Sequence, residues 1–154
     1  KGLSPFQPEK VAFESGRIML NRIDELFQNQ ENFAFETTLA SKTYKHKVNW
    51  AKASGYNTTL LFFWLKDSDL AKERVKVRVS EGGHNIPENV IERRYFNGIK
   101  NLFEIYMDIV EQTLIFDNSD GKPVLIAEKN FAENIIIHNL DKFNSLKKIY
   151  DERC

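Results

Sequence analysis

The sequence predicts an α/β fold in which helices flank a mainly parallel β-sheet. Segments with the pattern of strands alternate along the chain with segments of helical periodicity. Right-handed crossover connections join such strand–helix–strand units into parallel sheets. The segment from Thr58 to Leu65, TTLLFFWL, is a nearly continuous apolar run. Such a run is typical of a strand that is buried on both faces of a parallel sheet.

The length and composition are those of one globular domain. The chain has 154 residues, of which 42 % are hydrophobic and 29 % charged, and we predict a single domain over residues 1–154. Lysine plus arginine and aspartate plus glutamate both number 22, so the net charge is zero. A zero total lacks the cationic excess that drives non-specific nucleic-acid binding, and we expect no nucleic-acid partner, although a local basic patch is compatible with it.

The sequence contains no apolar run long enough to cross a membrane and no signal-peptide pattern. We therefore expect a cytoplasmic protein without a membrane partner. Cys154 is the only cysteine in these 154 residues, which excludes an intrachain disulfide and fits a reducing compartment. His46 and His138 have no neighbour at metal-ligand spacing, and we predict no metal site formed by this chain.

The first part of the chain alternates between the two patterns. Apolar residues recur at helical spacing from Pro8 to Phe27, which predicts a helix that packs on a sheet. Residues 32–38, NFAFETT, alternate in the manner of a strand. Ser41 is a plausible N-cap of the next helix, and Gly55 is its stop signal.

A second long helix is predicted over residues 86–112. Asn85 is its expected N-cap, Pro87 lies in its first turn, and Glu88 reaches back to the cap. The remaining expected elements are a helix capped by Asp67 or Ser68 that ends near Ser80, strands over residues 113–118 and 122–128, and a last helix with Leu140, Phe143 and Tyr150 on one side.

The two adjacent arginines of the long helix, Arg93 and Arg94, are predicted to lie at different distances from its buried face. Its apolar residues follow steps of four and three from Ile91 to Ile109 and define one buried stripe. At about 100° per residue, Arg94 lies roughly 60° from the centre of that stripe and Arg93 roughly 160° from it. Arg93 is therefore expected in solvent. Arg94 lies at the edge of the buried face, where it either pairs with a neighbouring acid or binds an anion.

More cations precede a glycine hinge. Arg74 and Arg78 are four residues apart and share one face of their helix. Gly82 and Gly83 then give the backbone unusual freedom before the helix of Arg94 begins. Guanidiniums that converge across such a hinge can neutralise a transferring phosphoryl group. The competing interpretation is that two helices present arginines to solvent.

A carboxylate and two hydroxyls follow the predicted strand over residues 32–38. Glu36 with Thr37 and Thr38 can hold the hydroxyl groups of a sugar or an alcohol, or can cap the next helix. Functional groups gather beyond the carboxyl ends of parallel strands, which also draws attention to Asp117 and Asn118. The 154 residues contain no G-x-x-x-x-G-K-[ST] motif for binding nucleotide phosphates.

The order of several segments resembles the zeta-toxin-like P-loop kinases, particularly the bacterial group often labelled predicted ATPases. The matching segments are GLSPFQPEKVAFESGRIML, ENFAFETTLAS, AKASGYNTTLLFFWL, ERVKVRVSEGGHNIPENVIERRY and FDNS, between Gly2 and about Ala127. The resemblance implies a P-loop-kinase-like sheet. It also implies ATP- and Mg-dependent phosphoryl transfer to a hydroxyl of a small acceptor, such as a UDP-linked amino sugar.

The resemblance assigns roles to two sets of residues. The family's acceptor-binding segment corresponds to Glu36, Thr37 and Thr38. The cations that contact nucleotide phosphates correspond to Arg74, Arg78 and Arg94, of which Arg78 and Arg94 are the expected catalytic pair, and the loop near the nucleotide contains Asn118.

The chain departs from the family pattern at its start. In the family, a first strand, the Walker A loop with its helix, and a second strand with the catalytic aspartate precede the segment that matches Gly2. We therefore expect this chain to be the C-terminal part of a larger kinase domain and to be inactive alone, with an antitoxin as a candidate partner. The alternative is a non-catalytic α/β interaction module that self-associates through the uncovered sheet.

Overall fold

The computed structural model describes residues 8–130 and 134–153. The chain forms two compact units, residues 1–36 and 37–154. The single domain predicted for residues 1–154 stays a prediction. Among the described residues, no helix combines the length and the hydropathy that a membrane span requires.

The N-terminal unit is built on one helix, α1 (Pro8–Gln28). Ile23 and Phe27, one turn apart, are buried, whereas Ile18 is largely exposed. The ring of Phe33 meets that of Phe27 edge-on at 5.1 Å, and Phe35 stacks on Phe33 at 6.5 Å. The predicted helix is therefore confirmed, and its C-terminal end carries an aromatic cluster.

The strand predicted over residues 32–38 is wrong, because this stretch is irregular and joins no β-ladder. The alternation of its phenylalanines serves local packing against α1 instead of a sheet. Beyond it, Leu39 adopts a left-handed backbone conformation with φ 58°. Its side chain is buried in the core of the C-terminal unit, so the chain turns there and enters that unit.

The sheet of the C-terminal unit contains β1 (Thr59–Trp64), β2 (Gln112–Asp117), β3 (Val124–Asn130) and β4 (Ile136–Ile137), in that order across the sheet. β1 and β2 are parallel, whereas β2–β3 and β3–β4 are antiparallel. The α/β fold is confirmed, but the sheet is mixed and not mainly parallel. The connection between β2 and β3 is a short turn, and a parallel pair would need a crossover of a dozen or more residues.

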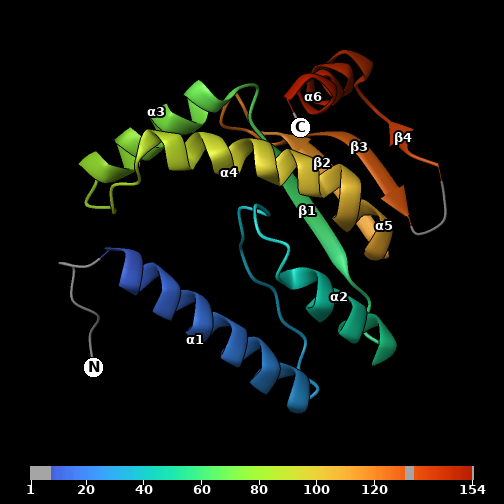
Figure 1. Ribbon diagram of the computed structural model, residues 1–154. Helices are drawn as coiled ribbons and strands as arrows, with labels where there is room; N and C mark the ends of the chain where they lie inside the picture. The colour runs from blue at the N-terminus through green and yellow to red at the C-terminus, as the bar shows by residue number, and fades with distance from the viewer. Residues whose placement is uncertain (1–7, 131–133, 154) are drawn as a thin grey trace. The chain divides into compact units, whose positions relative to one another are not determined.

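The helices of this unit are α2 (Tyr44–Ala53), α3 (Ser68–Ser80), α4 (Glu88–Asn101), the π-helical η1 (Leu102–Tyr106), α5 (Met107–Ile109) and α6 (Leu140–Arg153). Figure 1 shows α4 crossing the strand pair β1–β2. The π-helical segment shifts the phase of the long helix by one position. Tyr106 and Met107 are therefore buried, whereas the predicted stripe placed Ile105 and Ile109 there.

The structure confirms one of the predicted helix caps and corrects the others. The side chain of Asp67 caps α3 by accepting from Leu70 N at 2.7 Å, as predicted. Asn85 does not cap α4, because Pro87 occupies the N-cap position. The carboxylate of Glu88 does not reach back to the cap, because it forms an ion pair with Lys76 of α3. In α2, Thr43 and not Ser41 holds the cap position.

β1 is buried on one face only. Leu60, Phe62 and Trp64 pack into the core with residues of α4 and α6. Leu61 and Phe63, on the other face, are each 50 % exposed. The expectation of a strand buried on both faces is therefore wrong. Among the described residues, β1 ends the strand order, and the helices that fill the core lie against one face of it.

Candidate functional site

The carboxyl ends of β1 and β2 meet, because the parallel register ends with Trp64 opposite Asp117. Asn118 N donates to the carbonyl of Trp64 at 2.8 Å, and Lys66 N donates to Ser119 Oγ at 2.9 Å. These bonds tie the two strand ends into one polar edge. The prediction that Asn118 lies at the carboxyl end of a strand is confirmed.

Asp117 organises this edge. Its carboxylate is buried, accepts from Ser119 N at 2.9 Å and lies 2.8 Å from Lys142 Nζ on α6. Burial by itself raises the pKa of Asp117, but the hydrogen bonds from Lys142 and Ser119 outweigh it, and the pKa is lowered. Asp117 is therefore a buried anion neutralised by one lysine. Sequence reasoning singled out Asp117 by its place at a strand end but missed Lys142, which has no local signal.

Arg74 reaches the same edge from α3. Its guanidinium donates to the carbonyl oxygens of Asn118 and Ser119. The arginine thereby fixes the turn between β2 and β3. This contact brings two of the predicted residues, Arg74 and Asn118, together; a role for them in phosphate binding stays a prediction.

Arg94 lies on α4 as its helical phase predicts, half-buried, while Arg93 is exposed. In the described part of the chain no hydrogen bond or ion pair engages the Arg94 side chain. Of the two interpretations of Arg94, the salt bridge is thus not observed. The guanidinium is a half-buried cation whose donors are available to a ligand.

The segment with the two threonines lies on the same face of α4 as Arg94. Positions 94, 98 and 101 share that face by helical phase. A Cβ at Gly98 would lie 2.7 Å from the carbonyl oxygen of Thr38, and Asn101 Nδ2 donates to the carbonyl of Leu39 at 2.9 Å. Thr38 therefore touches α4 about one turn, or roughly 6 Å along the axis, from Arg94.

The predicted acceptor-binding residues straddle the two units. Glu36 is exposed and ends the N-terminal unit, whereas Thr37 and Thr38 begin the C-terminal one. The hydroxyl of Thr37 accepts from Leu39 N at 3.1 Å and so shapes the turn. The structure thus brings Thr38 near Arg94, and the position of Glu36 relative to Arg94 stays a prediction.

Arg78 lies at a different level from Arg94. Two ion pairs set the antiparallel register of α3 and α4, Lys76–Glu88 at 2.9 Å and Lys72–Glu92 at 3.3 Å. Extended by two residues beyond Glu92, this register places Arg94 beside the start of α3, whereas Arg78 lies near its end. The two arginines therefore lie about 12 Å apart along the helix axes, and the convergence of their guanidiniums stays a prediction.

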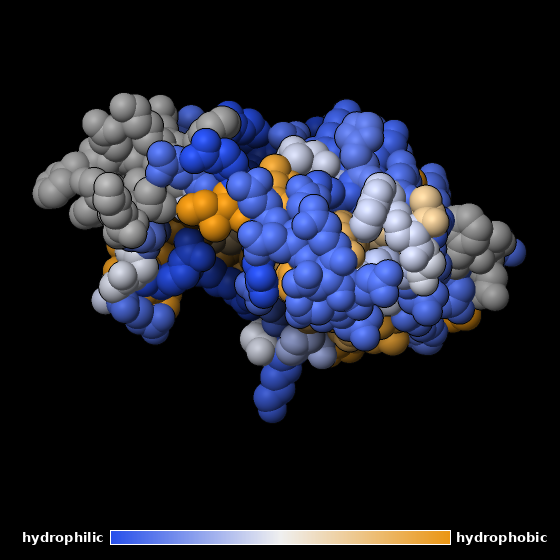
Figure 2. All heavy atoms as spheres, turned by 90° about the horizontal axis from the view of Figure 1, so that it is seen from below, coloured by the Kyte–Doolittle hydropathy of each residue, from blue (hydrophilic) through white to orange (hydrophobic). Residues whose placement is uncertain are grey.

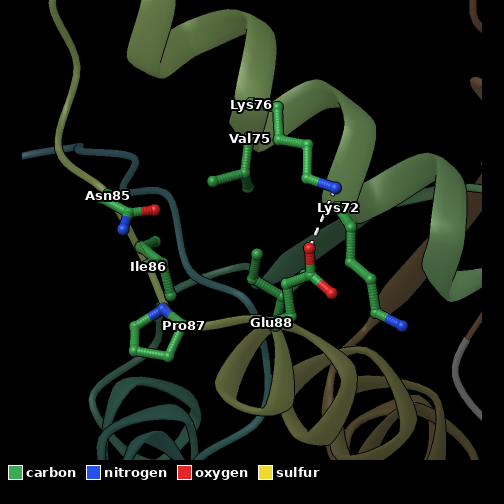
Figure 3. Close-up of a pocket in the computed structure, with 8 residues that line it drawn as sticks. Lys72, Val75, Lys76, Asn85, Ile86, Pro87 and Glu88 are labelled. Carbon is green, nitrogen blue, oxygen red and sulfur yellow. Dashed lines mark ion pairs between the residues drawn. The ribbon is translucent and has the colours of Figure 1, made fainter.

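A hollow of about 190 Å³ lies between α3 and α4 beside the loop that joins them. Figure 3 shows its residues, with the Lys76–Glu88 ion pair across it. The hydrogen bond and charge of Lys76 lower the pKa of Glu88. The residues that line the hollow are Lys72, Val75, Lys76, Asn85, Ile86, Pro87, Glu88 and Ile91. This set includes none of the predicted site residues.

Within residues 8–130 and 134–153, no three side chains of histidine, cysteine, aspartate or glutamate are grouped so as to hold a metal. The buried carboxylate of Asp117 already forms an ion pair with Lys142. Binding of ATP and Mg²⁺ stays a prediction.

Fold and site together define an α/β protein with cations, hydroxyls and a buried carboxylate near the carboxyl ends of a parallel strand pair. A family model described as Zeta toxin matches residues 8–131. The match covers more than half of the chain, and the chain belongs to the zeta toxin family. The resemblance of the sequence to this family is confirmed.

One relative is itself uncharacterized. A protein of Haemophilus influenzae (strain Rd) is 25 % identical over 93 residues, which cover 60 % of this chain and 66 % of that protein. The aligned part thus spans just under two thirds of the relative. No solved structure matches the chain. The helix that carries Lys142 lies beyond the residues that the family model matches.

Proposed function

We propose that this chain provides the acceptor-binding segment and phosphate-binding arginines of a kinase. The kinase transfers the γ-phosphoryl group of ATP to a hydroxyl of a small acceptor such as a UDP-linked amino sugar. The observation that supports this most directly is the contact between the Thr38 carbonyl and Gly98. It lays the threonine segment on the face of α4 that carries Arg94.

In this proposal Arg94 neutralises charge on the transferring phosphoryl group. Its half-buried position strengthens its field relative to water, and its donors are not engaged by the described residues. Arg78, about 12 Å further along the helix pair, binds a more distant phosphate. Arg74 and Asn118 belong to the polar edge at the carboxyl ends of β1 and β2. Arg74 acts by fixing the turn that contains Asn118.

The acceptor is oriented by Glu36 and the two threonines. A carboxylate accepts hydrogen bonds from hydroxyl groups, and threonine hydroxyls both donate and accept. During transfer, the acceptor oxygen forms a bond to phosphorus, the bond from phosphorus to the ADP oxygen breaks, and the hydroxyl proton passes to a base. The 154 residues contain no G-x-x-x-x-G-K-[ST] motif. We therefore propose that the ATP loop and the base lie outside them and that the chain alone is inactive.

Two measurements on the purified chain test this proposal. Calorimetry is expected to detect binding of UDP-N-acetylglucosamine, because the acceptor segment is present. An ADP-release assay with ATP, Mg²⁺ and the same acceptor is expected to show no turnover. Turnover that Arg94→Ala abolishes would overturn the predicted inactivity, and absence of acceptor binding would overturn the assignment of residues 36–38.

A specific observation favours a second function, a non-catalytic module that self-associates. β1 ends the described strand order, contains no charge or proline, and exposes half of both Leu61 and Phe63. Sheet edges without such protection pair readily with another chain. Figure 2 shows that apolar patches also interrupt one mostly polar face of the molecule.

Sedimentation equilibrium of the wild type and Leu61→Lys separates the two functions. A module that self-associates through β1 is expected to be a dimer or larger, and the lysine to return it to monomer. A wild type that is monomeric at all concentrations would remove this second candidate.

A further inference from the structure

Although the net charge of the chain is zero, one segment of it is purely basic. Residues 37–66 contain five lysines and one histidine but no aspartate or glutamate. The helix α2 lies in the middle of this segment. The expectation of no nucleic-acid partner rested on the total charge, and the total does not describe this surface.

The helix α2 divides into an inward and an outward face. Tyr44 packs against the core, and Ala51, seven residues on, is 4 % exposed. The opposite face, with the turn that leads into it, exposes side chains at steps of three and one. These are Lys42, Lys45, His46, Asn49 and Trp50.

The cations of this face are available to a ligand. In the described part of the chain, no hydrogen bond or ion pair engages the side chains of Lys42 and Lys45. By contrast, Lys52 at the end of the helix lies 3.6 Å from Glu111. Trp50 is 48 % exposed, so a large part of its side chain faces solvent on the same outward face.

We propose that this outward face, the α2 surface formed by Lys42, Lys45, His46 and Trp50, binds single-stranded nucleic acid. The lysines contact phosphates, and a base stacks on the indole of Trp50. Proteins that bind single strands without sequence preference combine cations along the backbone with aromatic rings under the bases. On this face His46 and Trp50, four residues apart, are neighbours about 6 Å apart along the helix, and Lys42 and Lys45 lie toward its N-terminal end.

Two other polyanions fit the surface less well. An acidic peptide would pair with the lysines but offers no base for the exposed indole. An anionic membrane binds helices whose apolar face is turned outward, whereas the apolar face of α2 is turned into the core. The combination of free cations and an exposed ring therefore favours nucleic acid. Because this surface needs neither ATP nor an acceptor, the inference is independent of the proposed kinase function.

Tryptophan fluorescence gives a direct test, since the other tryptophan, Trp64, is only 2 % exposed. Titration of the chain with an oligothymidylate of about 12 nucleotides is expected to quench the emission of Trp50 by stacking. Two phosphate contacts predict a slope of about −1.4 in log affinity against log salt concentration. Affinity should then fall about sevenfold between about 50 and 200 mM salt.

Matched variants identify the surface. Trp50→Ala is expected to weaken binding by about 5- to 150-fold, while Trp50→Phe keeps most of it. The double variant Lys42→Ala/Lys45→Ala should abolish most of the salt dependence. Lys148→Ala removes an exposed lysine that lies 3.7 Å from Glu152 on α6, and should leave binding unchanged.

Three results would overturn the proposal. The first is no quenching and no binding at low salt. The second is binding that survives both Trp50→Ala and the double lysine variant. The third is equal or tighter binding of polyglutamate or of vesicles containing phosphatidylserine, because either would assign the surface to a peptide or a membrane.

Discussion

The carbonyl oxygen of Thr38 rests directly on Gly98 of α4, so close that a Cβ at this glycine would lie 2.7 Å from it. One turn further along, Asn101 donates to the carbonyl of Leu39 at 2.9 Å. The segment that enters the C-terminal unit is therefore held by the backbone of one helix face. The same face carries Arg94, which places a polar segment and a half-buried cation side by side.

Gly98→Ala should displace this segment, because the added methyl meets a backbone oxygen and not a flexible side chain. We expect a loss of about 1–3 kcal/mol in the free energy of unfolding, measured by urea denaturation. Gly16→Ala in α1 is the control, since a Cβ there has no neighbour within 4 Å. That change should be neutral or stabilise by up to about 1 kcal/mol. Equal effects of the two variants would contradict the contact.

The ion pair of Asp117 with Lys142 should make stability depend on pH. Because the pKa of Asp117 is lowered in the folded state, its contribution is present above the unfolded pKa of about 3.9. The contribution is lost as the pH falls through the folded pKa. Urea denaturation should therefore show Asp117→Asn destabilised at pH 7, with the difference from wild type vanishing in strong acid.

Asp151→Asn is the matched control for this pH dependence. Asp151 pairs with Lys147 at 3.1 Å, but its side chain is 57 % exposed. Exposed pairs contribute about 0–1 kcal/mol, so this variant should stay close to wild type at every pH. A gap between Asp117→Asn and wild type that persists unchanged into acid would refute the assignment of Asp117 as a buried anion.

Tyr95 connects α4 to the end of β1. Its hydroxyl donates to the carbonyl of Leu65 at 2.8 Å and accepts from the indole nitrogen of Trp64 at 3.3 Å. Tyr95→Phe leaves that buried nitrogen without this acceptor, and we expect a loss of about 1–3 kcal/mol with a change in Trp64 emission. Tyr150→Phe, whose ring tilts against Phe103 at 4.9 Å, is the control and should change neither.

Much of the fold follows from local pattern. The helical periodicity before Ser80 and after Pro87 predicts α3 and α4, and the apolar run predicts β1. Helical phase also separates Arg93 from Arg94, because one residue rotates a side chain by about 100°. These features could be predicted since they depend on neighbours within one element.

Other features depend on contacts that the local pattern does not contain. Phe33 packs on Phe27 and Phe35 on Phe33, so the strand-like pattern of residues 32–38 forms no strand. The π-helical segment shifts the buried face of the long helix at a place with no proline or glycine signal. The ion pair between Asp117 and Lys142 joins a strand end to a distant helix, and in the sequence Lys142 resembles an ordinary surface charge.

The comparison of two adjacent arginines tests the central claim most directly. Amide chemical shifts of the purified chain, followed by NMR during titration with ATP, give the affinity for phosphate even when binding is weak. Arg94→Ala should lower this affinity by about 10-fold or more, because it removes a charge-assisted donor of about 1.5–3 kcal/mol. Arg93→Ala, with the same change in charge on the exposed face, should bind as wild type, and the shifts should centre on Thr38 and Gly98. Equal affinities of the two variants, or shifts that avoid this face of α4, would contradict the account.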